Sequence, residues 1–262
     1  MKKKLEYFLH KVFKKTANEC GNQIIKHIKK KDKKIKFLST INTNSLLHLE
    51  TDDEFRNSLI ASHWIVPDGF GTLVASKFLG LKIDQRISGT DMFNDVNYKL
   101  NNLKNCKYLF FGSTKKTLRS IVNKMKRDYP NIKITGYLSP PFKDKYNKTD
   151  NNKMINFINK KKPDVLWVGL TQPKMEKWIY ENLNKLDVKF VGAIGAVFDF
   201  YSGQVKRAPK IVQNLGFEWL YRLLQDPKRL WQRYLFANLN FIFNIIPYLL
   251  YIRLKNVFIN NS

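Results

Sequence analysis

Three observations predict an α/β fold with a mostly parallel sheet, helices on both of its faces and a C-terminal helical appendage. Between residues 36 and 203, short β-rich runs alternate with segments of helical periodicity, the pattern of parallel strands joined by helices. Most of these runs lead into glycine or into Pro-Asp-Gly. From residue 204 onward the alternation stops, and an arginine- and aromatic-rich helical segment begins.

The N-terminal segment, residues 1–35, is rich in lysine and is predicted to contain an amphipathic helix. Charged residues interrupt its apolar stretch, which argues against a cleaved signal peptide. One interpretation is a helix that packs on the domain, and the other is a helix that lies on an anionic bilayer. The apolar stripe with helical spacing consists of Leu5, Phe8, Leu9, Val12 and Phe13.

Residues 36–203 are predicted to form the sheet and its covering helices. The carboxyl ends of the strands are where doubly wound sheets bind ligands, and polar residues follow several of them. The expected strands are 36–40, 64–66, 108–111, 132–135, 165–168 and 189–192, and the glycines expected at strand ends are Gly69, Gly112, Gly136, Gly169 and Gly195. The helical stripes are Leu118, Ile121, Val122, Met125 and Tyr129, and then Trp178, Ile179, Leu183 and Leu186.

Residues 204–262 are predicted to form the appendage. Arg222, Arg229 and Arg233 share one helical face if Asp226-Pro227 only begins a new turn. Residues 234–252 carry no charge, and as a helix they would be about 28 Å long, enough to cross a bilayer. Asparagine side chains interrupt this run and would need partners in hydrocarbon. We therefore expect peripheral burial at the headgroup level rather than a span.

The charge balance predicts an anionic partner. The chain has 47 Lys and Arg against 21 Asp and Glu, a formal net charge of +26. Nucleic acid, an acidic membrane leaflet and a phosphorylated substrate all fit such a surface. Cys20 and Cys106 are the only cysteines in the sequence, so there is no disulfide framework, and a reducing cytoplasmic setting is expected.

Several kinds of site are absent from the sequence. The histidines and cysteines lack zinc-ligand spacing, and there is no Asp-x-Asp element, dinucleotide fingerprint, phosphate loop or nucleophilic-serine elbow. We therefore expect no metal and no cofactor. Asp68 lies between Pro67 and Gly69, so its carboxylate is expected on a tight turn at a strand end. The alternative is a turn aspartate that caps the next helix.

A series of motifs along the chain, taken together and in their order, resembles the bacterial WecG/TagA/CpsF glycosyltransferases, glycosyltransferase family 26, over roughly residues 37–234. The motifs are Thr40-Ile41-Asn42, Pro67-Asp68-Gly69-Phe70-Gly71, Arg86-Ile87-Ser88-Gly89-Thr90-Asp91, Phe110-Phe111-Gly112, 168–178, 195–203, Lys206-Arg207-Ala208-Pro209 and Glu218-Trp219-Leu220-Tyr221-Arg222-Leu223.

The resemblance implies a Rossmann-like catalytic domain over residues 36–203 and a metal-independent, inverting transfer. An N-acetylmannosamine-type sugar would move from a UDP donor to a polyprenyl-diphosphate-linked sugar in cell-surface polysaccharide synthesis. The enzyme would be peripheral on the inner face of the cell membrane, bound to an anionic surface. A homo-oligomer is compatible with this assignment.

The resemblance also assigns roles to particular residues. Asp68 takes the position of the general base, and Arg222, Arg229 and Arg233 look like arginines that close over the diphosphate, although a solvated or headgroup-binding basic face is the alternative. The expected acceptor and pocket residues are Thr40, Asn42, Arg86 and Gln172. The expected nucleotide-binding residues are Gly112, Gly169, Gly195 and Asp199.

One departure concerns the family's Pro-Lys-Gln-Glu, which here reads Pro173-Lys174-Met175-Glu176. A thioether cannot make the hydrogen bonds of the missing glutamine amide, and Gln172 substitutes only if its amide reaches the same space. Met175 therefore favours one alternative, a catalytically degenerate membrane-associated scaffold. The other alternative, suggested by charge alone, is a nucleic-acid-binding protein.

Overall fold

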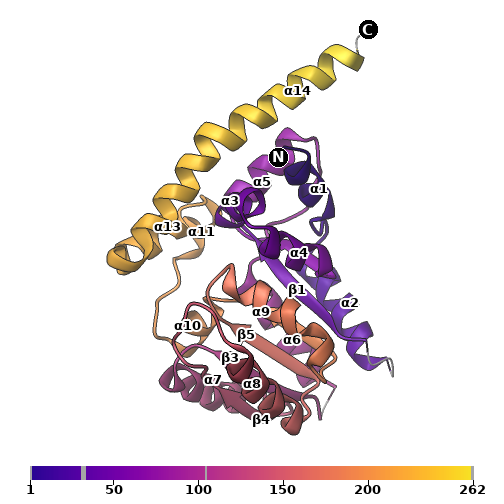
Figure 1. Cartoon of the computed structure of the whole chain (residues 1–262), viewed down its shortest axis with the longest axis vertical. Helices are drawn as coiled ribbons and strands as arrows, with labels where there is room; N and C mark the ends of the chain where they lie inside the picture. Colours follow the sequence, from indigo (N-terminus) through magenta and orange to yellow (C-terminus); the bar gives the residue numbers. More distant parts are fainter. Residues whose placement is uncertain (1, 31–33, 104, 261–262) are drawn as a thin grey trace.

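The computed structural model describes residues 2–30, 34–103 and 105–260, and within them one six-stranded sheet has helices around it (Figure 1). The strand order is β2-β1-β6-β5-β3-β4, and every pairing is parallel. The predicted α/β, Rossmann-like class is confirmed. The strands are β1 (Lys36–Ile41), β2 (Trp64–Pro67), β3 (Lys107–Gly112), β4 (Lys133–Leu138), β5 (Val165–Gly169) and β6 (Phe190–Ala193).

All six predicted strands exist, within two or three residues of their expected bounds. Four of the five glycines expected at strand ends lie at or just beyond an end. The exception is Gly136, which lies inside β4 and pairs with Leu109 of β3. The expectation for Gly136 was wrong because the strand continues to Leu138, past the glycine.

The central part contains a series of helices, and capping signals mark the start of several of them. Asn42, Ser88 and Asn147 each form a reciprocal capping box with a residue three positions later, which satisfies backbone N–H groups that a helix start leaves free. These helices are α3 (Thr43–Thr51), α4 (Asp53–Ala61), α5 (Phe70–Phe78), α6 (Gly89–Asn101), α7 (Lys115–Asp128), α8 (Lys148–Lys161), α9 (Lys174–Asn182), η1 (Leu183–Lys185) and α10 (Val197–Ser202).

Each face of the sheet has its own hydrophobic core, because successive strand residues point to opposite sides. On one face α6, α7 and α10 cover Tyr108, Phe110 and Trp167. On the other face α8 and α9 cover Leu109 and Phe111. This double cover leaves the carboxyl ends of the strands as the edge where polar groups gather.

The N-terminal helices α1 (Lys2–Lys11) and α2 (Ala17–Lys29) pack on the protein. Leu5, Phe8, Leu9 and Val12 are buried in a core shared with α3, α4, α5 and the C-terminal helix. The Phe13 amide donates to the Ile65 carbonyl of β2 at 2.8 Å. Of the two interpretations of the apolar stripe, the structure therefore shows the helix that packs on the domain, and these side chains are not free to enter a bilayer.

Truncating Leu9 tests this packing. Leu9 is fully buried, so Leu9→Ala is expected to lower the free energy of unfolding by about 2–5 kcal/mol, from lost apolar burial and the cavity left behind. Urea denaturation followed by circular dichroism measures this. The exposed neighbour His10 provides the control, because His10→Ala removes no buried contact. A change at Leu9 as small as that at His10 would contradict the packing.

The C-terminal segment is helical and extends away from the sheet (Figure 1). It comprises α11 (Lys210–Asn214), α12 (Glu218–Gln225), α13 (Pro227–Asn240), the π-helical turn η2 (Phe241–Ile245) and α14 (Ile246–Asn260). Residues Pro227–Lys255 form one helix that is long and apolar enough to cross a membrane by length and composition.

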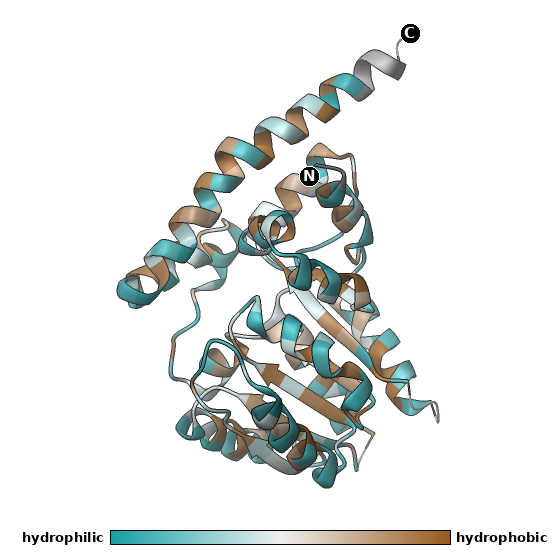
Figure 2. Ribbon diagram, in the orientation of Figure 1, coloured by the Kyte–Doolittle hydropathy of each residue, from teal (hydrophilic) through white to brown (hydrophobic). Residues whose placement is uncertain are grey.

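This long helix has two different sides. Ala237, Ile245 and Leu249 are buried against the protein, and the Tyr248 hydroxyl hydrogen-bonds the Glu6 carboxylate of α1. Figure 2 shows hydrophobic and hydrophilic residues intermixed along it. The exposed apolar side chains are Trp231, Leu235, Phe236, Leu239, Ile242, Phe243, Leu250, Tyr251 and Leu254.

The division into residues 1–35, 36–203 and 204–262 stays a prediction. Residues 1 and 31–33 of the first part and 261–262 of the last part lie outside the described residues. Cys20 and Cys106 are both buried and free.

Candidate functional site at the carboxyl edge of the sheet

Asp68 lies directly after β2, at the carboxyl edge of the sheet. Its amide donates to the Ile41 carbonyl at the end of β1 at 2.8 Å, so the turn is tied to the neighbouring strand. Helix α5 begins at Phe70, with Gly69 at its N-cap and no side-chain cap hydrogen bond. The Asp68 carboxylate therefore does not cap this helix, and the geometry agrees with the other interpretation, a carboxylate held on a tight turn.

An arginine connects Asp68 to the appendage. Arg86 Nη1 lies 3.9 Å from Asp68 Oδ1 and 3.1 Å from Glu218 Oε2 of α12. Arg207 Nε lies 3.1 Å from the other oxygen of Glu218, and Arg207 Nη2 donates to Ser88 Oγ at 3.1 Å. Two arginines thus bracket one carboxylate, and they fasten α12 beside Asp68.

Burial changes the acidity of Asp68. It raises the pKa of the carboxyl to about 6, whereas the Arg86 guanidinium lowers it and the nearby Glu218 and Asp91 carboxylates raise it. The side chain keeps 28% of its exposure, so a bound molecule can reach it. A carboxylate with a pKa of about 6 is ionised at neutral pH and is a stronger base than an ordinary aspartate.

Removing the Arg86 charge is expected to raise the pKa of Asp68 further. Arg86→Gln keeps a hydrogen-bonding side chain but loses the cation that favours the ionised carboxylate. A carbon-13 NMR titration of the aspartate carboxyls measures this shift. An unchanged or lower pKa for Asp68 in Arg86→Gln would contradict the electrostatic contact.

Gln172 joins three elements at the carboxyl edge of the sheet. Its Nε2 donates to the Thr40 carbonyl of β1 at 3.3 Å and to Glu176 Oε1 of α9 at 2.9 Å. Its Oε1 accepts from the Ser45 hydroxyl of α3 at 2.9 Å. The Gln172 amide therefore lies against the strand end that carries Thr40 and the helix start that Asn42 caps.

Asn42 itself has a structural task. Its side-chain Oδ1 accepts from the backbone N–H of Ser45 at 3.1 Å, and the Ser45 hydroxyl accepts from the backbone N–H of Asn42 at 2.9 Å. This capping box fixes the start of α3 next to Gln172. Thr40 is almost fully buried, so of the predicted acceptor residues it is the least accessible.

Met175 lies away from this network. Its side chain is buried in the core of the α8 and α9 face, among Val168, Trp178 and Ile179. The next residue, Glu176, is fully buried and faces Gln172. The Gln172 amide thus contacts the Thr40 carbonyl, and the Met175 thioether packs in the core.

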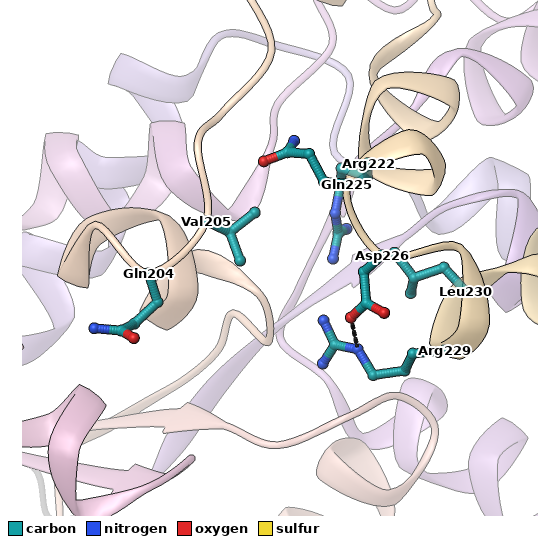
Figure 3. A pocket seen from close by; sticks show the side chains of 7 residues that line it. All are labelled: Gln204, Val205, Arg222, Gln225, Asp226, Arg229 and Leu230. Atoms are coloured by element: carbon teal, nitrogen blue, oxygen red, sulfur yellow. Dashed lines mark hydrogen bonds and ion pairs between the residues drawn. The ribbon is translucent and has the colours of Figure 1, made fainter.

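Arg222 and Arg229 line a cavity of about 260 Å³ between α12, α13 and the segment that follows α10 (Figure 3). Arg229 Nε lies 2.6 Å from Asp226 Oδ2, and Arg222 lies over the Phe200 ring at 5.2 Å. Burial raises the pKa of the neighbouring Asp199, and the charges of Arg229 and Arg222 oppose that shift. The other lining residues are Gln204, Val205, Gln225, Asp226 and Leu230.

The three arginines do not share one helical face, because α12 ends at Gln225 and α13 begins at Pro227, with Asp226 in a non-helical conformation between them. Arg233 does not line the cavity, and it acts electrostatically on Glu176 and on His48 of α3. Burial lowers the pKa of Arg233, as do the charges of Arg222 and Arg229. A shared face required that Asp226-Pro227 only begin a new turn, and the helix instead breaks there. The three arginines nevertheless remain near one another.

The glycines at the strand ends fulfil packing needs within the protein. A Cβ on Gly112, which has φ +122°, would lie 2.4 Å from the Gly169 carbonyl oxygen. A Cβ on Gly169 would lie 2.2 Å from the Phe198 ring, whereas Gly195 has φ +51° and more space. The ends of β3 and β5 therefore approach each other as closely as only glycine allows.

Sequence reasoning did not single out four residues of this edge as functional: Ser45, Glu176, Arg207 and Glu218. Ser45 has a visible signal, since it stands three positions after Asn42 in a capping-box pattern. The other three lie within the motifs quoted above, but their partners are 4 to 132 positions away in the chain. Only the fold shows these contacts.

Comparisons of the sequence with known proteins find one family. A sequence model of the glycosyl transferase WecG/TagA/CpsF family matches residues 7–254. An N-acetylglucosaminyldiphosphoundecaprenol N-acetyl-beta-D-mannosaminyltransferase of Bacillus subtilis (strain 168) is 34% identical over 199 residues, which cover 76% of this chain and 74% of the relative. A protein of the same name from Staphylococcus aureus (strain MW2) is 27% identical over 194 residues, 74% of each chain.

Proposed function

The chain belongs to the WecG/TagA/CpsF glycosyl transferase family, and from this premise we propose that it transfers an N-acetylmannosamine-type sugar from a UDP donor to a polyprenyl-diphosphate-linked sugar. The names of the relatives describe an N-acetylmannosaminyl transfer to a diphosphoundecaprenol-linked acceptor. The observation that carries the proposal in this chain is Asp68, held at the carboxyl edge beside Arg86 and Gln172.

In the proposed reaction Asp68 is the general base. An acceptor hydroxyl attacks the anomeric carbon of the donor from the side opposite the diphosphate, and Asp68 takes the hydroxyl proton as the new glycosidic bond forms. The bond between the anomeric carbon and the diphosphate oxygen breaks, and UDP leaves. A single displacement of this kind inverts the anomeric centre.

The leaving diphosphate needs positive charge, which we assign to Arg222 and Arg229 with Arg233 nearby. Arginine guanidinium groups bind phosphate oxygens with two N–H donors and stay charged through the reaction. We place the nucleotide beside Asp199 and the backbone at Gly112, Gly169 and Gly195. This arrangement supports a transfer that needs no metal ion.

EDTA tests this arrangement. Turnover in a chelator-treated reaction is expected to stay within about twofold of the untreated rate, because the arginines supply the charge that a divalent ion would otherwise supply. The measurement is UDP release with and without EDTA. A loss of most of the activity that Mg²⁺ or Mn²⁺ restores would contradict the metal-independent scheme.

We assign Thr40, Asn42 and Gln172 to the acceptor side of the site, because they form one hydrogen-bonded edge next to Asp68. The exposed apolar side of the long C-terminal helix, together with its Lys- and Arg-rich surroundings, supports peripheral binding to the anionic inner face of the cell membrane. There the lipid-linked acceptor would be available to the site.

The donor is tested with a panel of UDP-sugars and a short-chain lipid-diphosphate acceptor. UDP-N-acetylmannosamine is expected to give acceptor-dependent UDP release, and UDP-glucose and UDP-galactose are expected to give much less. Faster release with a UDP-hexose that lacks the N-acetyl group would overturn the proposed donor.

A further inference from the structure

Glu176 is buried at a cost that packing does not explain. Its side chain is fully buried in the first turn of α9, and Oε2 has no hydrogen-bond partner among the described residues. A buried carboxyl oxygen without a partner is unfavourable, because burial removes its hydration and no hydrogen bond replaces it. A methionine or leucine of similar volume would avoid this penalty. A polar group kept under such conditions is typical of a functional site.

The electrostatic surroundings give the same indication. Burial raises the pKa of Glu176 to about 7, whereas the hydrogen bond from Gln172, a hydrogen bond from the backbone N–H of Glu176 itself and the charge of Arg233 lower it. Arg233 also has a buried Nε without a hydrogen-bond partner in the described part of the chain. Both groups thus carry unused hydrogen-bonding capacity beneath the proposed acceptor side.

The satisfied oxygen, Oε1, determines how the Gln172 amide is oriented. A glutamine amide has two N–H donors on one side and an acceptor oxygen on the other. The Thr40 carbonyl and Glu176 Oε1 are both acceptors, at 3.3 and 2.9 Å from Nε2. The nitrogen must face them, and the oxygen then faces the Ser45 hydroxyl. Without Glu176, the amide keeps the longer contact to Thr40 and the contact to the Ser45 hydroxyl, but a hydroxyl can donate or accept and so does not fix which end of the amide faces it.

We propose that Glu176 is a positioning residue that fixes the amide of Gln172 at the acceptor side of the site. Since it is fully buried, it does not touch substrate and acts through Gln172. This inference rests on the proposed function, because the effect of the fixed amide is on sugar transfer. Misplacing a substrate-orienting group by about 1 Å can cost about 100-fold in rate.

The first test replaces Glu176 with an apolar residue of similar length. Glu176→Met is expected to lower kcat/KM by about 10- to 100-fold, while Tm stays unchanged or rises, because the unsatisfied buried oxygen is removed. Glu176→Gln keeps an acceptor oxygen for Gln172 and is expected to recover most of the wild-type kcat/KM. A purely structural role would instead lower Tm and activity together.

A double-mutant cycle tests whether Glu176 acts through Gln172. Gln172→Met removes the amide, so adding Glu176→Met to it is expected to cause no further loss of kcat/KM beyond about twofold. Interacting residues show this kind of non-additivity, and independent residues do not. All four proteins are compared with the same donor and short-chain acceptor, and melting curves confirm that each is folded.

The results distinguish failure of this inference from failure of the proposed function. If the wild-type protein transfers no sugar, the proposed function is wrong. If the wild type is active, two results overturn the positioning role. One is that Glu176→Met lowers kcat/KM as much in the Gln172→Met background as in the wild-type background. The other is that Glu176→Gln fails to recover activity.

Discussion

Asp68→Asn is expected to lower turnover by about 100- to 10,000-fold, the usual effect of removing a general base. The amide has nearly the shape of the carboxylate but cannot accept the acceptor proton. Arg86 is paired with Glu218 at 3.1 Å, and this ion pair does not involve Asp68, so donor binding is expected to persist in the variant. Steady-state turnover and calorimetric binding of the UDP-sugar measure the two effects separately.

The pH dependence follows from the raised pKa of Asp68, about 6. The base acts in its ionised form, so kcat/KM is expected to be constant above that pKa and to fall about tenfold per pH unit below it. The matched control is Asp84→Asn, which removes an exposed carboxylate in the loop before Arg86 and is expected to leave the profile unchanged. Wild-type turnover in Asp68→Asn would refute the assignment of the base.

Neutralising the cavity arginines is the second large expected effect. The double variant Arg222→Gln with Arg229→Gln is expected to lower kcat with a soluble acceptor by at least about 100- to 1000-fold, because losing even one donor to a developing anion costs roughly 2.7–4 kcal/mol in favourable cases. A single Arg229→Gln is expected to cost less, since Arg222 lines the same cavity. Single-turnover kinetics separate this effect from donor binding.

The control for this experiment is Arg253→Gln. Arg253 is exposed on the same long helix but far along it from the cavity, and a soluble acceptor makes membrane binding irrelevant. It is expected to retain the wild-type rate. If the Arg222 and Arg229 double variant retains full turnover with the soluble acceptor, those arginines form only a basic surface, the alternative weighed for them.

Much of the fold could be predicted because local patterns and tertiary structure agree here. The strand after Lys107 is a continuous apolar run buried on both faces of the sheet, which is what a central parallel strand requires. Asp68 could be singled out because Pro and Gly flank it at a strand end. Gly136 failed as a marker because glycine is also tolerated inside a strand next to a long side chain, here Lys161.

The contacts across the site could not be predicted from spacing alone. Arg86 and Glu218 meet across 132 positions, and so do Gln172 and Thr40. The departure at Met175 shows the same limit, because the sequence could not reveal that Met175 is a core residue while Gln172 reaches Thr40. The scaffold alternative therefore remains a prediction that the activity measurements below distinguish from the transferase.

The N-terminal lysine-rich helix shows how tertiary packing decides between patterns that look alike. An amphipathic stripe with a basic opposite face suits both a bilayer surface and a protein core. Here Phe8 and Leu9 are buried beside Ile245 and Leu249 of the C-terminal helix. The partner of the stripe is thus another part of the same chain, more than 230 positions away.

The mass of the acceptor after incubation tests the central claim most directly. Purified protein is mixed with UDP-N-acetylmannosamine and a short-chain lipid-diphosphate that carries one N-acetylglucosamine, and the lipid product is analysed by mass spectrometry. Our account predicts a gain of one N-acetylhexosamine residue, which Asp68→Asn prevents. An acceptor of unchanged mass, with or without release of UDP by hydrolysis, would contradict it.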